Sequence, residues 1–242
     1  MLPDHDQDRG YERSPTMSDR VALVVGAGGP LGRSVALKLV GAGFTVAGVD
    51  RNADGLSELP DGVRQMPGDA TDPAVAKAVV DRVAAEVGPP EVLVNTIGTY
   101  GIGDALSATP DQLRQMMDVN VGPALWLTQA VAPYMKERGS GSITFVSSRW
   151  AAEPYAGVAA YSLSKAALSH LVRVLDLELR PQGIRVNAVA PQLIDTPVNR
   201  SFLPEEVMAH ATSPEAIAEL IVLLAGDGGA PVSGAVLPAY GF

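Results

Sequence analysis

The chain of 242 residues has 47% hydrophobic and 19% charged side chains, the composition of an ordinary globular domain, and this excludes disorder throughout. Its formal net charge of −9 would repel a nucleic-acid backbone, so we expect no nucleic-acid partner. The chain has no cysteine, which excludes disulfides, thiolate zinc sites and thiol nucleophiles. The three histidines, His5, His170 and His210, are scattered, and we expect no metal site.

The two ends of the chain show no sign of membrane insertion or export. The longest apolar stretch near the C-terminus, Ala216 to Ala225, is interrupted by Glu219 and is far shorter than the roughly 20 residues that span a bilayer. The acidic residues 1–16 lack the basic start and apolar core of a secretory signal. We therefore expect a cytoplasmic protein with no membrane partner. Residues 1–16 are either a disordered arm or the product of a misassigned start codon, since Met17 precedes the first patterned segment.

Short β-branched runs alternate with longer amphipathic segments, which is typical of parallel strands joined by crossover helices. The predicted strands are Val21–Val25, Thr45–Val49, Val63–Met66, Val92–Thr96, Ser142–Val146, Arg185–Val189 and Ala235–Leu237. The clearest helical patterns are Gly32–Val40, Pro73–Val87, Pro110–Lys136, Ser162–Leu179 and Pro214–Ala225. Most strands are nearly continuously apolar, as expected for burial on both faces. The sequence thus predicts a single α/β domain over residues 17–242, with a three-layer, doubly wound parallel sheet of about seven strands, the Rossmann fold.

A glycine-rich turn follows the first predicted strand. In a doubly wound fold, backbone N–H groups and a helix dipole bind a pyrophosphate at this place. The turn reads Gly26-Ala-Gly28-Gly29-Pro30-Leu31-Gly32. Leu31 stands where G-x-G-x-x-G has its third glycine, so the spacing that fits is Gly26-x-x-Gly29-x-x-Gly32. Taken alone, the segment is also compatible with an ordinary tight turn.

An acidic residue ends the second predicted strand, eighteen residues after Gly32. Asp50 lies close to the separation at which a carboxylate binds the ribose hydroxyls of a dinucleotide, and it would repel a 2′-phosphate. We therefore expect NAD rather than NADP. The adjacent Arg51 leaves NADP open, because a guanidinium can accommodate the phosphate. The alternative for Asp50 is a solvated charge that opens a turn.

Tyr161 and Lys165 lie four residues apart at the start of a helical pattern, so both side chains project from one face. We expect the ammonium to favour the ionised phenol, whose free pKa is about 10, and to make proton transfer feasible near neutral pH. Thirteen residues before Tyr161, Ser148 ends a buried strand pattern, at the edge where open α/β sheets bind ligands.

Taken in this order, the glycine turn, the acid, the serine and Tyr-x-x-x-Lys resemble the short-chain dehydrogenase/reductase family from Ser18 to the C-terminus. Asn120, in Asp-Val-Asn-Val, matches the asparagine of the family's catalytic tetrad, which Ser148, Tyr161 and Lys165 complete. The resemblance implies cofactor contacts from Gly26, Gly28, Gly29, Leu31, Gly32, Asp50, Arg51, Asp69, Ala70, Asn95, Gly98, Tyr161, Lys165, Pro191, Ile194 and Thr196.

The resemblance also implies a mechanism. Tyr161 exchanges a proton with the substrate oxygen while a hydride passes between the substrate carbon and the nicotinamide. Lys165 holds the cofactor ribose and depresses the pKa of the tyrosine. Ser148 orients the carbonyl or hydroxyl, and Asn120 supports a water that relays protons through the lysine.

The sequence departs from the family pattern in three places. Val25 and Pro30 replace the threonine and second glycine of the usual Thr-Gly-x-x-x-Gly-x-Gly turn, and the resulting spacing resembles the family's extended branch. Because proline has no N–H, we expect an altered pyrophosphate grip. Thr96 and Ile97 replace Asn-Ala, which predicts a bulkier, less polar wall beside the cofactor. Gln192 replaces the glycine after Pro191, where we expect it to narrow the nicotinamide pocket or contact substrate.

The substrate pocket is predicted from loops at the same edge. Trp150, Tyr155, Gln192 and Phe202 are our candidate substrate-binding residues, and loop packing is the alternative for Trp150, Tyr155 and the nearby Arg149. Residues 197–213 form either a short apolar lid over the substrate or a surface helix.

The function expected from these features is an NAD(P)(H)-dependent oxidoreductase that interconverts a small-molecule secondary alcohol and a ketone. The alternatives are an NADPH-dependent 3-oxoacyl thioester reductase with the same tetrad and a non-catalytic binding or scaffold protein of the same fold. The family resemblance further implies a homodimer or homotetramer, with a homotetramer favoured, through the two long helices around Pro110–Lys136 and Ser162–Leu179.

Overall fold

The structure, a computed structural model, describes residues 20–241, and the predicted arm of residues 1–16 lies outside them. Its centre is a parallel sheet of seven strands in the order β3-β2-β1-β4-β5-β6-β7. The strands are β1 Val21–Val25, β2 Thr45–Asp50, β3 Val63–Pro67, β4 Pro90–Asn95, β5 Gly141–Val146, β6 Ile184–Pro191 and β7 Val236–Ala239. The chain winds outward from β1 to β3 and then returns to β4 on the other side of β1. This is the predicted doubly wound order, and the predicted single-domain Rossmann fold is confirmed.

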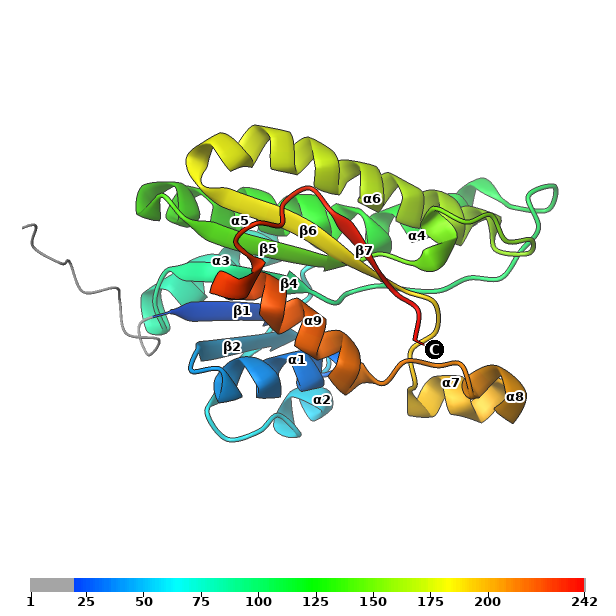
Figure 1. The fold of residues 1–242 in the computed structure, drawn as a ribbon, viewed down its shortest axis with the longest axis horizontal. Coiled ribbons are helices and arrows are strands. Elements are labelled where there is room, and N and C mark those ends of the chain that lie inside the picture. The colour runs from blue at the N-terminus through cyan, green and yellow to red at the C-terminus, as the bar shows by residue number, and fades with distance from the viewer. Residues whose placement is uncertain (1–19, 242) are drawn as a thin grey trace, which may run out of the picture.

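Helices cover both faces of the sheet (Figure 1). One layer holds α1 Pro30–Gly41, α2 Ala53–Ser57 and α9 Pro214–Ala225. The opposite layer holds α3 Pro73–Glu86, α4 Pro110–Asn120, α5 Gly122–Arg138 and α6 Ala159–Leu179. The short helices α7 Pro197–Phe202 and α8 Glu205–Met208 project beyond the carboxyl end of β6, and single 3₁₀ turns lie at η2 Arg149–Ala151, η3 Arg180–Gln182 and η4 Asp227–Gly229.

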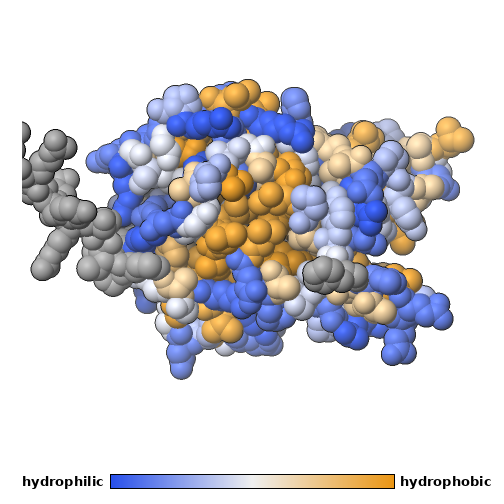
Figure 2. All heavy atoms as spheres, viewed as in Figure 1, coloured by the Kyte–Doolittle hydropathy of each residue, from blue (hydrophilic) through white to orange (hydrophobic). Residues whose placement is uncertain are grey.

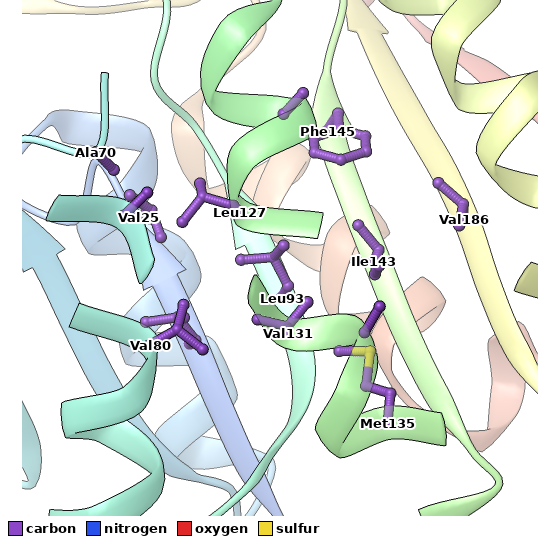
Figure 3. Packing of buried hydrophobic residues seen from close by; sticks show 14 of the residues in the cluster. Val25, Ala70, Val80, Leu93, Leu127, Val131, Met135, Ile143, Phe145 and Val186 are labelled. Carbon is purple, nitrogen blue, oxygen red and sulfur yellow. The ribbon is translucent and has the colours of Figure 1, made fainter. Parts of the chain in front are cut away.

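The central strands are apolar on both faces because each face packs against a helical layer. In β1, Val21, Leu23 and Val25 belong to the core under α3, α5 and α6, whereas Ala22 and Val24 belong to the core under α1 and α9. Figure 3 shows the first of these cores, where side chains of α5 pack against β4 and β5. This two-sided burial explains why the strands read as continuous apolar runs.

The prediction of one helix over Pro110–Lys136 was wrong, because the chain forms two helices that meet at Val121. Pro123 lies in the first turn of α5. Its ring nitrogen has no proton to donate to the carbonyl four residues back, and its ring clashes with that carbonyl. The break therefore ends α4 at Asn120, a candidate catalytic residue.

The surface in Figure 2 shows apolar side chains gathered at the middle of the face that carries α9 and β7. On α9, Leu223 is exposed although its neighbour Leu224 is buried. None of the helices within residues 20–241 combines the length and the apolar character needed to cross a bilayer.

Candidate active site at the carboxyl edge of the sheet

The carboxyl edge of the sheet gathers most of the residues predicted for the site. They lie at or just beyond the ends of β1, β2, β4, β5 and β6, whose directions are all parallel. Two further elements complete the edge: α4 ends there with Asn120, and α6 begins there with Tyr161 and Lys165 in its first two turns. The parallel topology thus brings together residues that are up to 170 positions apart in the sequence.

The glycine turn after β1 is folded tightly against β2. The amides of Gly26 and Ala27 both donate to the Val49 carbonyl, at 2.8 and 3.0 Å. Gly26 has a φ of +83°, a conformation that side chains rarely adopt, and a Cβ at Gly32 would lie 2.1 Å from the Gly26 carbonyl oxygen. Glycine is therefore required at both positions for the helix to start this close to the strand.

Pro30 is the first residue of α1, where a helix needs no N–H donor. The next two amides, of Leu31 and Gly32, have no acceptor among the described residues. These two N–H donors and the positive end of the helix dipole together make the N-terminus of α1 suited to an anion. Pro30 supplies no N–H group here, as expected, so two free backbone donors are left.

Asp50 holds the glycine turn in place by hydrogen bonds. Its Oδ2 accepts the Gly28 amide at 3.0 Å, and its Oδ1 accepts the Asn52 amide at 2.9 Å. The carboxylate therefore lies beside the turn that starts α1, where the sequence predicts a ribose contact.

Arg51 points toward the neighbouring acid. Its Nη1 lies 3.8 Å from Asp69 Oδ2, and its side chain is 74% exposed. Hydrogen bonds from Thr71, with a smaller contribution from the Arg51 charge, hold the pKa of Asp69 below its ordinary value. Ala70, which follows Asp69, is buried.

The segment after β4 is anchored to the glycine turn. The Thr96 hydroxyl donates to the carbonyls of Val25 and Gly26, at 3.0 and 3.1 Å, and Asn95 Oδ1 accepts the Ile97 amide at 3.0 Å. The two larger side chains therefore point into the protein. The Thr96 hydroxyl is bound to the turn after β1, and Ile97 packs against the core under α3, α5 and α6.

Gly98 lies close against two candidate catalytic side chains. A Cβ at this position would lie 3.2 Å from both Asn120 Oδ1 and Lys165 Nζ. This is tighter than nearly all real Cβ contacts, so any larger residue would press on both side chains.

Asn120 is buried and uses its whole amide to hold two segments together. Its Oδ1 accepts the Thr99 amide at 2.8 Å, and its Nδ2 donates to the Thr99 carbonyl at 3.0 Å and to Ser164 Oγ at 2.9 Å. Ser164 in turn donates to the Tyr161 carbonyl at 2.7 Å. Asn120 therefore fixes the loop after β4 against the first turns of α6. Ser164 was not predicted, and no spacing in the sequence marks it.

Lys165 is only 4% exposed, and its ammonium donates to the Val146 carbonyl at 2.9 Å, where β5 ends. Burial lowers its pKa from 10.5 to about 8. Its Nζ lies 6.0 Å from the centre of the Tyr161 ring, so the two side chains share one face of α6 as predicted.

Tyr161 forms the reactive end of the site together with Ser148. Burial raises the pKa of Tyr161 above 10, and its hydrogen bond with the buried Ser148 opposes this shift. Burial is the largest influence on this pKa, and the Lys165 ammonium is directed at the Val146 carbonyl, so the expected lowering of the Tyr161 pKa by Lys165 stays a prediction. Tyr161 is therefore protonated at neutral pH and is set to donate a proton.

Three more aromatic rings surround Tyr161. The centre of the Tyr100 ring lies 4.9 Å from that of Tyr161 in an edge-to-face arrangement, and Trp150 lies 6.2 Å from it. Tyr155 stacks on Trp150 at 4.8 Å, and Tyr100 lies 5.9 Å from Trp150. Tyr100 was not among our predicted residues, although its place in the glycine-rich loop after β4 was a usable signal.

Gln192 joins the end of β6 to the segment after Ser148. Its Oε1 accepts Arg149 Nη1 at 2.7 Å, while Arg149 also pairs with Glu153 at 2.6 Å and lies over the Tyr240 ring. Gln192 therefore helps, through Arg149, to position the segment that carries Trp150.

The rest of the segment after β6 frames the same edge. Pro191 is buried, Ile194 forms a bridge with Thr212, and the Thr196 hydroxyl caps α7 by accepting the Asn199 amide at 3.2 Å. Phe202 is 55% exposed and takes no part in the described aromatic contacts. No group of three His, Asp or Glu side chains that could hold a metal is found within residues 20–241.

Comparison with known proteins gives a consistent result. A family model described as short chain dehydrogenase matches residues 20–207. The chain is 30% identical to the 4-formylbenzenesulfonate dehydrogenase of Comamonas testosteroni, over 93% of this chain and 98% of that protein. It is 31% identical to a 3-oxoacyl-[acyl-carrier-protein] reductase of Thermotoga maritima, over 91% and 96% of the two chains. The solved structure of a 7α-hydroxysteroid dehydrogenase complexed with NADH and 7-oxo glycochenodeoxycholic acid matches with a TM-score of 0.87 and 28% identity, over 93% and 96%.

Proposed function

We propose, since the chain belongs to the short-chain dehydrogenase family, that it interconverts a small secondary alcohol and a ketone with a nicotinamide dinucleotide. The observation that best supports this proposal is the half-buried Tyr161, hydrogen-bonded to Ser148 on one side and sharing a helix face with the buried Lys165. A protonated phenol, next to a hydroxyl that orients the reacting oxygen and to an ammonium that stabilises the phenolate, matches the general acid that ketone reduction requires.

The residues around the glycine turn fit a dinucleotide. Two unpaired helix amides, at Leu31 and Gly32, suit a pyrophosphate, and the Lys165 ammonium would hold a ribose hydroxyl. When bound, the nicotinamide ring supplies or accepts the hydride. Asp69, Ala70, Asn95, Pro191, Ile194 and Thr196 would contribute to the rest of this site.

Each catalytic side chain has a separate task in the proposal. Tyr161 gives its phenolic proton to the carbonyl oxygen in reduction and takes it back in oxidation, while Ser148 orients that oxygen. Lys165 supplies positive charge behind the phenol, which stabilises the phenolate left after proton transfer. Asn120 holds the loop after β4 in place and supports the water through which the lysine exchanges protons with solvent.

We propose NAD as the preferred cofactor. Asp50 places a carboxylate next to the turn, where it would accept ribose hydroxyls and repel a 2′-phosphate. The nearby cation Arg51 is directed toward Asp69, which leaves it less available to a phosphate. NADP requires Arg51 to turn away from this acid.

An NADPH-dependent 3-oxoacyl thioester reductase is the second candidate, favoured by the 31% identity to the Thermotoga maritima protein. The ratio of kcat/KM for NADH and NADPH separates the two. A strong NADPH bias together with turnover of a 3-oxoacyl thioester would replace our proposal with this one.

Self-association and a substrate lid complete the proposal. Exposed Leu163 and Leu177 on α6, and a groove of about 420 Å³ beside α5 that includes Trp126 and Tyr134, support a homodimer or homotetramer through the long helices. Light scattering measures its size. Residues 197–213, which form α7 and α8, are the proposed lid, with Phe202 as its candidate substrate contact.

The proposed function is tested with the purified full chain. A panel of secondary alcohols with NAD and of ketones with NADH is assayed at 340 nm, and calorimetry measures binding of each cofactor. We expect cofactor binding and turnover of at least one alcohol–ketone pair. A folded protein that binds neither nicotinamide cofactor would instead be the non-catalytic scaffold.

A further inference from the structure

The ring cluster around the catalytic phenol, formed by Tyr100, Trp150, Tyr155 and Tyr161, concentrates the chain's aromatic residues at one place. The whole chain has only 12 aromatic residues, from 2 Trp, 6 Tyr and 4 Phe, so a third of them meet here. They come from three separate segments: the loop after β4, the stretch from η2 to the start of α6, and α6 itself. Such a gathering around the reacting group points to the kind of substrate that the site accepts.

Backbone contacts fix the ring cluster in place. The Gly103 amide donates to the Gly157 carbonyl at 2.7 Å, and the Ala159 amide donates to the Gly103 carbonyl at 3.1 Å. These bonds hold the loop that carries Tyr100 against the segment that carries Tyr155 and leads into α6. The rings therefore form a preset wall, because their positions are set by the backbone on both sides.

The outer rings of the cluster keep free surface for a ligand. Tyr100 is 44% exposed and Tyr155 is 60% exposed, although each touches another ring. Tyr100 also lines a cavity of about 170 Å³ together with Met116 and Ala160, so there is free space beside its ring. Large aromatic surfaces left open to water beside a reactive group are suited to stacking on another flat ring.

The charges next to the ring cluster are already compensated. Arg149, one residue before Trp150, pairs with Glu153 at 2.6 Å and donates to Gln192. The ammonium of Lys165 is buried behind Tyr161. The wall therefore offers flat apolar surface and no unpaired charge for an anionic substrate group.

We propose that the substrates are uncharged aryl alcohols and ketones, in which the aromatic ring is directly attached to the reacting carbon. This inference depends on the proposed function. In oxidation, the carbinol C–H and O–H bonds break and the C=O bond forms. The hydride goes to the oxidised nicotinamide cofactor. The O–H proton goes to Tyr161 in its phenolate form, which arises when Tyr161 first releases its own proton to solvent through the water beside Lys165. The substrate ring packs against Tyr100, Trp150 and Tyr155.

The experiment compares 1-phenylethanol with 1-cyclohexylethanol, which differ only in whether the ring is flat. The ratio of their kcat/KM values is measured for the wild type, for Trp150→Leu and for Trp150→Phe. Comparing this ratio between proteins cancels the intrinsic difference in reactivity of the two alcohols. Phe44→Leu, which removes an aromatic ring at the amino edge of the sheet, away from the ring cluster, is the control.

We expect Trp150→Leu to lower the ratio by about three- to tenfold, the size of a lost aromatic contact. Trp150→Phe keeps most of the preference, and Phe44→Leu leaves it unchanged. If Trp150→Leu lowers only the melting temperature and leaves the ratio intact, the rings merely pack on one another and the inference is wrong.

A binding measurement separates this inference from the proposed function. Benzamide and cyclohexanecarboxamide, which carry an inert carbonyl, are titrated into the same variants by calorimetry in the presence of NADH. A preference for benzamide that Trp150→Leu abolishes supports the aryl site even if neither alcohol is turned over, and that absence of turnover contradicts the proposed function alone. Equal binding of the two amides would overturn the inference.

Discussion

At the amino edge of the sheet, charged side chains form a closed network, whereas at the carboxyl edge several polar groups have few partners. Glu91, in β4, accepts Arg20 at 2.6 Å through one oxygen and Arg138 at 2.9 Å through the other. Arg20 also reaches Asp227 at 3.2 Å and lies over the Phe44 ring. This network joins the start of β1 to the ends of α5 and α9.

The carboxyl edge contains groups with few or no partners. Lys165 is buried with one carbonyl acceptor, the pKa of Tyr161 is raised by burial, and the first amides of α1 have no acceptor among the described residues. Such groups cost folding free energy, because burial without full pairing removes favourable hydration. From this comparison we expect the amino edge to stabilise the fold and the carboxyl edge to provide the reactive groups at some cost in stability.

The largest effect is expected from Tyr161→Phe, which removes the proton donor and keeps the ring. We expect kcat to fall by about 10³-fold, since general acid catalysis contributes about 10²–10⁴-fold. Cofactor binding measured by calorimetry and the melting temperature should stay close to the wild-type values. Substantial residual turnover would show that another group moves the proton.

Lys165→Met sharpens the comparison because its effects on activity and stability have opposite signs. We expect turnover to fall by at least about 100-fold, since the positive charge behind the phenol is lost. Removing a buried ammonium should nevertheless stabilise the fold by about 1–2 kcal/mol, after the cost of leaving the Val146 carbonyl unpaired. Urea denaturation measures this gain.

The same variant also tests the pKa of Lys165, which burial lowers to about 8 in the folded chain from 10.5. Between these two values the unfolded chain binds a proton that the folded chain does not, so this group makes the folded state more stable as pH rises through the window. The stability advantage of Lys165→Met over the wild type should therefore be largest below pH 8 and shrink toward pH 10.5. An advantage that does not change with pH would contradict the burial of a titrating ammonium.

At the amino edge, Glu91→Gln should affect only stability. It leaves Arg20 and Arg138 facing each other without the carboxylate, and we expect a loss of about 2–3 kcal/mol in urea denaturation with kcat/KM unchanged. Glu219→Gln, which breaks the exposed pair with Lys38 at 2.9 Å, is the matched control and should cost less than about 0.5 kcal/mol. Equal losses in both variants would mean that the network is no stronger than a surface pair.

The smallest effect is expected from Gln192→Ala, which removes the hydrogen bond to Arg149 and loosens the wall that carries Trp150. We expect KM for the alcohol to rise about two- to threefold with kcat nearly unchanged, as for one lost hydrogen bond of about 0.5–1 kcal/mol. Gln182→Ala, at the amino edge, where Gln182 donates to the Glu178 carbonyl, should leave KM unchanged. A rise in KM in both variants would point to a general loss of order.

Local patterns in the sequence predict much of this molecule. Strand interiors such as Val21–Val25 are apolar throughout, and the Tyr161–Lys165 spacing places both side chains on one helix face, because these are short-range properties of the chain. The division of Pro110–Lys136 into two helices was missed, although Pro123 marks it, since the apolar pattern continues across the break.

Contacts between distant segments could not be predicted in this way. Arg149 and Gln192 are 43 residues apart and meet only because β5 and β6 are neighbours with a common register. The direction of the Tyr161 pKa shift also depends on burial by rings from other segments, such as Tyr100. Sequence spacing indicates which groups share a helix face, but it does not indicate how much water reaches them.

The Thr96 hydroxyl, which spans the carbonyls of Val25 and Gly26, has a consequence for how this chain can diverge. It joins the end of β4 to the glycine turn, just before the loop that carries Tyr100. Mutations after Thr96 can change the shape of the ring cluster without disturbing the glycine turn. Substrate specificity can therefore change independently of cofactor binding, and new specificities can evolve while the cofactor site stays the same.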